Sequence, residues 1–305
     1  MTIYVSEQGH SSLDKAVDML GIGKKYLRKV KTDDQFRMDL GGLEYKIKLD
    51  KKKGLLPICV VGIAGTTNTG AVDDLKAIDT IAKKYDLWYH IDAAYGGPAA
   101  KVPSVKQFFD GLDLADSVVI DPHKWMYIPF EAGCFIVKDP GKLRKTFSTI
   151  PDYLRSEKDD DGRTDLMEYQ LPLTKSFKSL KVWMTLKAYG ASRLREAIQE
   201  DINRAKFLAG LVEESEDFEL LAPVPLSIAV FRYAPQKLNE KKIEALNKML
   251  LPAIEQDGRI FLTGTKVRGK TALRTCFINP RTEIKHVKNI LDVVRDLGSR
   301  TIEKL

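Results

Sequence analysis

The chain has 305 residues, of which 44% are hydrophobic and 30% are charged. This is the composition of a globular protein, and it excludes a wholly disordered or collagen-like chain. No run approaches the ~18 consecutive apolar residues of a membrane-spanning helix, and the first seven residues lack the features of a signal peptide. We therefore expect a cytoplasmic protein that does not enter a membrane.

Charge and cysteine content bear on whether the protein binds nucleic acid and on whether it is held together by disulfides or a metal. Lysine and arginine number 49 against 42 acidic residues, a net charge of +7, but the two signs alternate along most of the chain. The densest basic run is Lys51–Lys53, and no helix-turn-helix, zinc-finger or RNA-binding motif is visible, so we expect no nucleic-acid partner. The three cysteines lie far apart, which predicts neither disulfides nor a metal site, and we expect each to be buried.

In the first half of the chain, short apolar runs alternate with helical patterns, which predicts a mostly parallel sheet covered by helices. The run at 57–64 is continuously apolar, as expected of a strand buried on both faces. The predicted strands are 3–5, 57–64, 87–91, 117–120 and 133–137, and the predicted helices are 13–20 and 73–85.

The second half of the chain differs in character. Residues 156–163 are too highly charged for a core and predict a mobile surface loop. Two helices should follow, the second with an apolar stripe from Leu194 to Val212. The rest predicts a small α+β unit with strands near 226–233, 259–262 and 272–277 and helices near 241–251 and 283–297. We accordingly divide the chain into a large α/β domain, 1–178, and a small C-terminal domain, 179–305, which includes the connecting helices.

Polar side chains follow four of the predicted strands. His10 comes after the first strand, Thr66–Thr67 after the second, Asp92 after the third and His123–Lys124 after the fourth. In open α/β sheets the carboxyl ends of the strands form the ligand crevice. Four such ends with polar groups therefore predict one site at this edge of the sheet.

Asp92 and Lys124 carry the most specific chemistry. Taken singly, Asp92 could cap the next turn and Lys124 could extend its ammonium group to solvent. Together they supply what pyridoxal phosphate requires, which is a lysine that forms a Schiff base and an acid that pairs with the ring nitrogen. His10 could then stack on the ring, and a hydroxyl of Thr66–Thr67 could bond its edge.

Five segments in one order give a resemblance to a known family. They are Ser6–Ser12 with Lys15–Ala16, Ala64–Ala71, His90–Gly97, Asp121–Trp125 and Leu273–Thr282. These segments resemble those of the group II pyridoxal-phosphate-dependent amino acid decarboxylases, which include the aromatic-amino-acid, histidine and glutamate decarboxylases. The resemblance covers nearly the whole chain. It implies a fold-type-I, transferase-like large α/β domain with a mostly parallel sheet, incomplete at its N-terminus, and a small C-terminal α+β domain.

The resemblance also implies which residues hold the cofactor. Lys124 would be the Schiff-base lysine and Asp92 the partner of the pyridinium nitrogen. His10 would stack on the ring, and Ala94 would press on its opposite face. Thr67 would lie near the ring oxygen or near Asp92.

Three further residues would act on the phosphate or the substrate. His123 would contact either of them, and Arg274 would meet a substrate carboxylate, with a structural strand arginine as the alternative. Tyr153 would return a proton to the substrate carbon, reaching it from the neighbouring subunit of a homodimer. The implied reaction converts an L-amino acid, with a mild preference for an aromatic one, to an amine and carbon dioxide.

Departures from the family keep other readings open. Members usually have a longer segment before the first motif, which forms the dimer and holds the phosphate, and many carry a Gly-Arg-Arg pattern where this chain has Leu173–Lys178. The alternatives are another fold-type-I lyase, aldolase or transaminase, or a truncated or split-gene fragment that is inactive without its N-terminal partner. We expect the 305-residue chain alone to bind the cofactor weakly.

Overall fold

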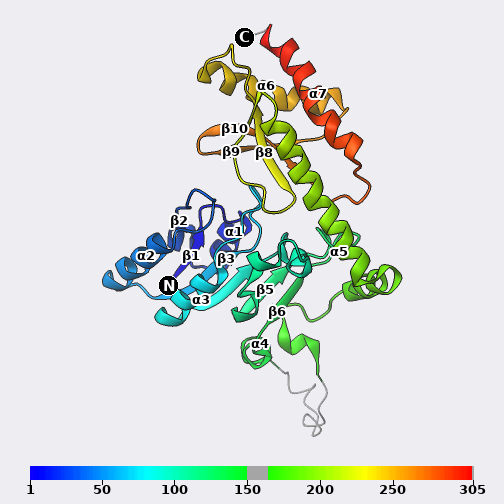
Figure 1. Ribbon diagram of the computed structural model, residues 1–305. Coiled ribbons are helices and arrows are strands. Elements are labelled where there is room, and N and C mark those ends of the chain that lie inside the picture. Colours follow the sequence, from blue (N-terminus) through cyan, green and yellow to red (C-terminus); the bar gives the residue numbers. More distant parts are fainter. Residues whose placement is uncertain (150–163, 304–305) are drawn as a thin grey trace.

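A computed structural model describes residues 1–149 and 164–303, and it contains two sheets joined by a long helix (Figure 1). The first sheet has the strand order β2-β1-β3-β4-β5-β6, and β6 alone among these strands runs antiparallel to its neighbour. Its strands are β1 Thr2–Ser6, β2 Leu27–Val30, β3 Pro57–Ile63, β4 Trp88–Asp92, β5 Ser117–Ile120 and β6 Cys134–Val137. The predicted mostly parallel sheet is thus confirmed.

The helices around this sheet begin and end where local side chains can satisfy the backbone. They are α1 Ser12–Met19, α2 Leu40–Lys52, α3 Leu75–Tyr85 and α4 Pro140–Phe147. The Asp74 side chain accepts a hydrogen bond from the N–H of Ala77 and so caps the start of α3. Asp86 ends the same helix in the left-handed conformation. The buried faces of α2 and α3 contribute Leu43, Ile47 and Ile78 to the core of the sheet.

Helix α5, Lys178–Glu213, connects the two sheets, as Figure 1 shows. Gly190 has non-helical backbone angles, so the element consists of two helical stretches, and the second carries the predicted apolar stripe. Ile198 and Ile202 pack into the core of the first sheet, whereas Ala205 and Leu208 pack into the core of the second. One straight stretch of helix is therefore shared by both cores.

The second sheet is antiparallel with the order β7-β8-β10-β9, and two helices pack against it. The strands are β7 Phe218–Leu220, β8 Ile228–Tyr233, β9 Thr263–Val267 and β10 Lys270–Cys276, and the helices are α6 Glu240–Asp257 and α7 Ile284–Ile302. This is the small α+β unit that the sequence predicts. The division at residues 178 and 179 stays a prediction.

Some sequence-based expectations differ from the structure. Residues 259–262 form no strand; the edge strand is the more polar segment β9, because it can form a hairpin with β10 through the turn at Arg268 and Gly269. Ile260 and Leu262, which precede β9, instead pack on the second core, whereas Phe261 is exposed. Elements β2, α2, α4 and β7 were not predicted.

Cys134 is exposed, against expectation, because β6 lies at the edge of the sheet. Tyr153 and the loop at 156–163 lie outside the described residues.

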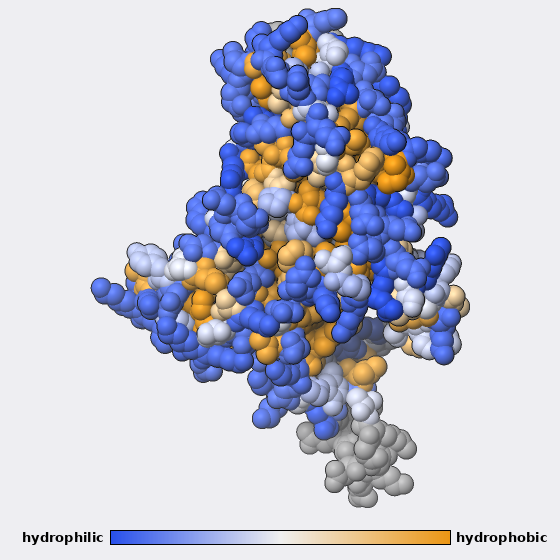
Figure 2. Space-filling view, in the orientation of Figure 1, coloured by the Kyte–Doolittle hydropathy of each residue, from blue (hydrophilic) through white to orange (hydrophobic). Residues whose placement is uncertain are grey.

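Apolar side chains are exposed over a broad area of the molecule, part of which Figure 2 shows. One group of them lies just before α5 and along its first stretch: Leu171, Leu173, Phe177, Trp183, Met184 and Tyr189. Phe135 and Ile136 on the edge strand β6 are also about half exposed. Within the described residues, no helix combines the length and the apolar character needed to cross a membrane.

Candidate active site

The carboxyl ends of four neighbouring strands meet at one edge of the first sheet. Ile63 at the end of β3 is paired with Asp92 at the end of β4, and Asp92 is paired with Val119 of β5. The strand order reverses between β1 and β3, which is where open α/β sheets place their ligands. A cavity of about 220 Å³ lies at this edge, lined by Gln8, His10, Ser12, Ile63, Gly65, Thr67, Asp92, Ala94, Tyr95, Val119, Asp121 and Lys124.

Asp92 has an incompletely satisfied carboxylate. Its Oδ1 accepts a hydrogen bond of 3.1 Å from the N–H of Ala94, and no salt bridge to it is found among the described residues. The nearby His90 supplies no cation at neutral pH, because burial lowers its pKa despite the opposing charge of Asp92. A half-buried carboxylate at a cavity wall without a protein cation is suited to a cationic group of a ligand.

Lys124 lies in a tight turn that follows β5. Its N–H donates a hydrogen bond of 2.8 Å to the carbonyl oxygen of Asp121, and its Nζ lies 3.0 Å from Oδ2 of the same residue. The side chain is 37% exposed, and it lines the cavity instead of extending freely to solvent. Asp121 had no predicted role, although its position three residues before Lys124 on a turn is the signal that could have found it.

His10 and Thr67 also line the cavity, on the turns that follow β1 and β3. The hydroxyl of Ser12 lies 2.8 Å from Nδ1 of His10, and the N–H of Ser12 donates to the same nitrogen, which orients the ring. Of the two threonines, Thr66 is fully buried and bonds Thr69 within its own turn, so Thr67 is the one at the cavity. Sequence reasoning did not single out Gln8, Ser12 or Tyr95.

Two predicted residues lie outside the lining of this cavity. Nδ1 of His123 is 2.7 Å from the carbonyl oxygen of Ala132, and its ring packs edge-on against Phe130. Arg274, on β10, donates to the hydroxyl of Thr263, and its buried Nε has no partner among the described residues. Their predicted roles, like that of Tyr153, are not tested by these positions.

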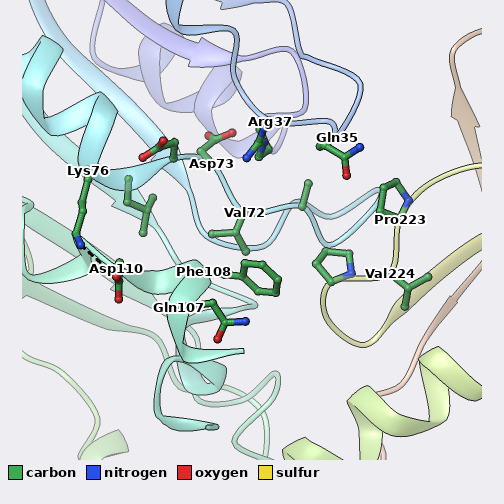
Figure 3. A pocket seen from close by; sticks show the side chains of 14 residues that line it. Gln35, Arg37, Val72, Asp73, Lys76, Gln107, Phe108, Asp110, Pro223 and Val224 are labelled. Atoms are coloured by element: carbon green, nitrogen blue, oxygen red, sulfur yellow. Dashed lines mark hydrogen bonds and ion pairs between the residues drawn. The ribbon is translucent and has the colours of Figure 1, made fainter. Parts of the chain in front are cut away.

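A larger cavity, of about 460 Å³, lies where α3 begins (Figure 3). Its two cationic side chains already have acidic partners, since Arg37 pairs with Asp33 and Lys76 with Asp110. None of the predicted site residues lines it. This cavity is larger than the one beside Lys124, but the chemistry of the side chains favours the smaller one.

The residues of the smaller cavity fit pyridoxal phosphate. An amine, an acid without a cationic partner, a histidine and a small alanine surround a space suited to one ring, below the ~300–1,000 Å³ usual for drug-sized ligands. Gly65 and Gly96 keep the backbones of two turns in close contact beside it. Among the lining residues that the structure describes, Lys124 is the one lysine or arginine.

Comparisons with known proteins agree with this chemistry. The family model "Pyridoxal-dependent decarboxylase conserved domain" matches residues 1–234. Aromatic-L-amino-acid decarboxylase of Bacillus atrophaeus is 34% identical over 97% of this chain and 62% of its own length. Phenylacetaldehyde synthase of Arabidopsis thaliana is also 34% identical, over 100% of this chain and 63% of its own.

The fold agrees as well. The crystal structure of Oryza sativa TDC with PLP and tryptamine matches with a TM-score of 0.93 and 28% identity, covering 99% of this chain and 63% of that chain. The chain thus spans less than two thirds of the length of these relatives. The family model, by contrast, covers more than half of the chain. The chain therefore belongs to the pyridoxal-dependent decarboxylase family.

Proposed function

We propose that this chain is the catalytic part of an enzyme that decarboxylates an aromatic L-amino acid to the amine. The observation that carries the proposal is one small cavity with the amine of Lys124 and the unpaired carboxylate of Asp92 on its wall. The aromatic substrate class is supported by the name of the Bacillus atrophaeus relative. When bound, pyridoxal phosphate supplies the electron sink that accepts the electron pair left by the departing carboxylate.

The protein's own groups would each have a separate task. The Lys124 amine would bond the cofactor aldehyde, and the Asp92 carboxylate would keep a proton on the ring nitrogen. His10 and Ala94 would confine the ring between them. Asp121, 3.0 Å from Nζ of Lys124, would hold the ammonium group whenever this lysine is not bonded to the cofactor.

Three further residues would complete the reaction. We propose that Tyr153 returns a proton to the substrate carbon, that His123 contacts the phosphate or the substrate and that Arg274 receives a substrate carboxylate. The buried, unpartnered Nε of Arg274 supports a further acceptor for this guanidinium. For the phosphate, the lining offers no second lysine or arginine among the described residues, so we propose backbone N–H groups or another polypeptide segment as its partners.

The exposed apolar side chains around the first stretch of α5 support an assembly. Leu171, Phe177 and Tyr189 are each more than two thirds exposed, and large exposed apolar patches mark interaction sites. We propose that a homodimer, or an assembly with an N-terminal segment, covers this surface.

We also propose a cytoplasmic location, which three cysteines without disulfides support.

Labelling of Lys124 tests the proposal. The chain is incubated with pyridoxal phosphate, reduced with borohydride, digested and mapped by mass spectrometry. We expect the cofactor on the peptide that contains Lys124 and no specific labelling after Lys124→Arg. Labelling of another lysine while Lys124 stays unmodified would refute the assignment. Strong labelling of Lys124 without amine production from tyrosine or tryptophan would favour a fragment that needs a partner.

A second candidate function is aldehyde formation, because the Arabidopsis thaliana relative is named a phenylacetaldehyde synthase. Both reactions release carbon dioxide, but aldehyde formation also releases ammonia and requires an oxidant such as dioxygen, which takes up two electrons and becomes hydrogen peroxide. The organic product therefore distinguishes the two reactions. Chromatography of the products from phenylalanine or tyrosine should show the amine. Aldehyde as the main product would favour the second function and would count against a proton-donating role for Tyr153.

A further inference from the structure

Helix α5 contacts the turn that carries Lys124 through a buried acid. Asp201 is fully buried, and its Oδ2 accepts hydrogen bonds from the indole N–H of Trp125, at 3.1 Å, and from the hydroxyl of Tyr127, at 2.8 Å. Its Oδ1 accepts from Arg204 at 2.7 Å. A carboxylate with three donors in a buried site is a strong and specific contact.

The turn itself depends on outside support. Trp125, the residue after Lys124, is fully buried, and the N–H of Ile128 closes the turn by donating to the carbonyl of Pro122. Tyr127 has a φ of 56°, a left-handed conformation that is unfavourable for a bulky residue. Such a conformation persists only where its surroundings hold it. The Tyr127 hydroxyl on Asp201 is a contact that can do so.

The same acid is connected to the turn that carries Asp92. The rings of Trp125 and Tyr95 are stacked with their centroids 4.8 Å apart and their planes 9° apart. Tyr95 follows Asp92 by three residues and lines the cavity. A shift of Trp125 would therefore move both turns that bring the amine and the acid together.

We propose that Asp201 is a positioning residue for Lys124, which it holds at the cavity through Trp125 and Tyr127. The inference rests on the proposed function of Lys124, and it adds a residue of the connecting helix that contacts neither the cavity nor its lining lysine. Arg204 acts with Asp201 by balancing its charge, while Glu200 holds the outer side of Arg204 at 3.0 Å.

The experiment compares variants within this network. Asp201→Asn keeps the shape of the side chain but places an uncharged amide where Trp125, Tyr127 and Arg204 donate hydrogen bonds. Tyr127→Phe removes one of these donors, the tyrosine hydroxyl. Glu200→Gln is the matched control, because it changes the same ion network on its exposed side and contacts neither Trp125 nor Tyr127. The full 305-residue chain is used without cofactor, so the result does not depend on cofactor binding.

Two readouts report on the turn. The first is the rate of reductive methylation of Lys124 at a fixed pH, compared with Lys76, another lysine paired with an aspartate, at 3.1 Å. The second is amide hydrogen exchange of residues 121–128. We expect Asp201→Asn to speed both by about threefold or more, with Lys76 and strand β1 unchanged, as local opening predicts. Tyr127→Phe should have a smaller effect in the same direction, and it keeps the test valid if Asp201→Asn does not fold.

Equal changes at Lys124 and Lys76, or effects no larger than those of Glu200→Gln, would overturn the proposal and leave Asp201 a general stabilising residue. Labelling of another lysine by the cofactor, while Lys124 stays unmodified, is a separate result. It would refute the proposed function without altering the exchange and methylation rates of the cofactor-free chain.

Discussion

Asp92 is half-buried and Asp73 is buried. Both acids lie near the ends of parallel strands, but their surroundings give them different roles. Asp73 accepts hydrogen bonds from two backbone N–H groups, of Met38 and Ile63, and thereby joins the end of β3 to the segment that precedes α2. Asp92 has one backbone donor and borders a cavity. The first is built into the fold, and the second is available to a ligand.

Asp92→Asn should impair the reaction more than the fold. The amide keeps the hydrogen bond from Ala94 but cannot stabilise a protonated ring nitrogen. Loss of such a charged pair removes ~3 kcal/mol or more of transition-state stabilisation, on the order of 10²-fold in rate. Turnover and urea denaturation of an active preparation check this, with the exposed Asp86→Asn as the matched control. Near-normal turnover would contradict the role of Asp92.

Asp73 should make the stability depend on pH. Burial raises its pKa to about 6, although the two backbone hydrogen bonds lower it. Because the folded state then binds the proton more tightly than the unfolded state does, the contribution of Asp73 is full below about pH 4 and falls as the pH rises to about 6. The loss is about 3 kcal/mol in the free energy of unfolding.

Urea denaturation of the chain and of Asp73→Asn between pH 4 and pH 7 measures this effect. The difference in unfolding free energy between the two should change by about 3 kcal/mol over that range. Asp74→Asn, at the neighbouring exposed position, controls for effects unrelated to burial. A difference that is independent of pH would show that Asp73 titrates in its ordinary range.

At the scale of elements, close contact between turns shapes the site. The turn after β4 packs on the end of β3, where the N–H of Ala64 donates to the carbonyl of Asp92 at 2.8 Å. A Cβ on Gly96 would collide with the carbonyl oxygen of Ala64, which is backbone and cannot move aside alone. The cavity therefore requires glycine at this position.

Gly96→Ala should lower the free energy of unfolding by about 1–3 kcal/mol, the usual cost of overpacking. Gly210→Ala on α5 is the matched control, because no atom lies within 4 Å of its added Cβ and alanine favours the helix by up to about 1 kcal/mol. Chemical denaturation should thus show opposite signs for the two substitutions. Equal effects would mean that the turn can relax around the added methyl group.

At the scale of the molecule, the C-terminal unit contacts the site turns directly. The hydroxyls of Tyr95 and Ser227 lie 2.5 Å apart, and the N–H of Ser227 donates to the same tyrosine oxygen. The hydroxyl of Thr265 donates to Asn68, whose side-chain amide donates to Gln8 at the cavity. The two cores, which already share α5, are thus also joined through polar contacts beside the site.

Tyr95→Phe should weaken this connection while keeping the stack on Trp125. It would leave the hydroxyl and the N–H of the fully buried Ser227 without their partner, at a cost of about 1–3 kcal/mol. Urea denaturation measures the loss. Tyr45→Phe, at an exposed position, should change the stability by less than about 0.5 kcal/mol. Similar stabilities for the two variants would show that water replaces the tyrosine hydroxyl.

The sequence predicted most of the first sheet, because the signals for its strands are local. It also placed at one edge of this sheet several residues that line one cavity, although their roles stay predictions. A continuous apolar run such as β3 identifies a buried strand, and parallel neighbours bring their carboxyl ends to one edge whatever the details of packing. Asp92 and Lys124 could therefore be paired from their positions at two strand ends alone. The prediction of a strand at 259–262 was wrong for the opposite reason. Ile260 and Leu262 pack on the second core, and whether a segment pairs as a strand depends also on the segment beside it.

Packing between distant segments settled the remainder. The position of Asp121 beside Lys124 depends on the direction of one turn, and the burial of Asp201 under Trp125 depends on side chains far apart in the chain. No periodicity encodes such contacts, because each arises only when the sheet, the connecting helix and the C-terminal unit have come together. The chemistry of the site could thus be read from residue types, whereas its geometry required the assembled fold.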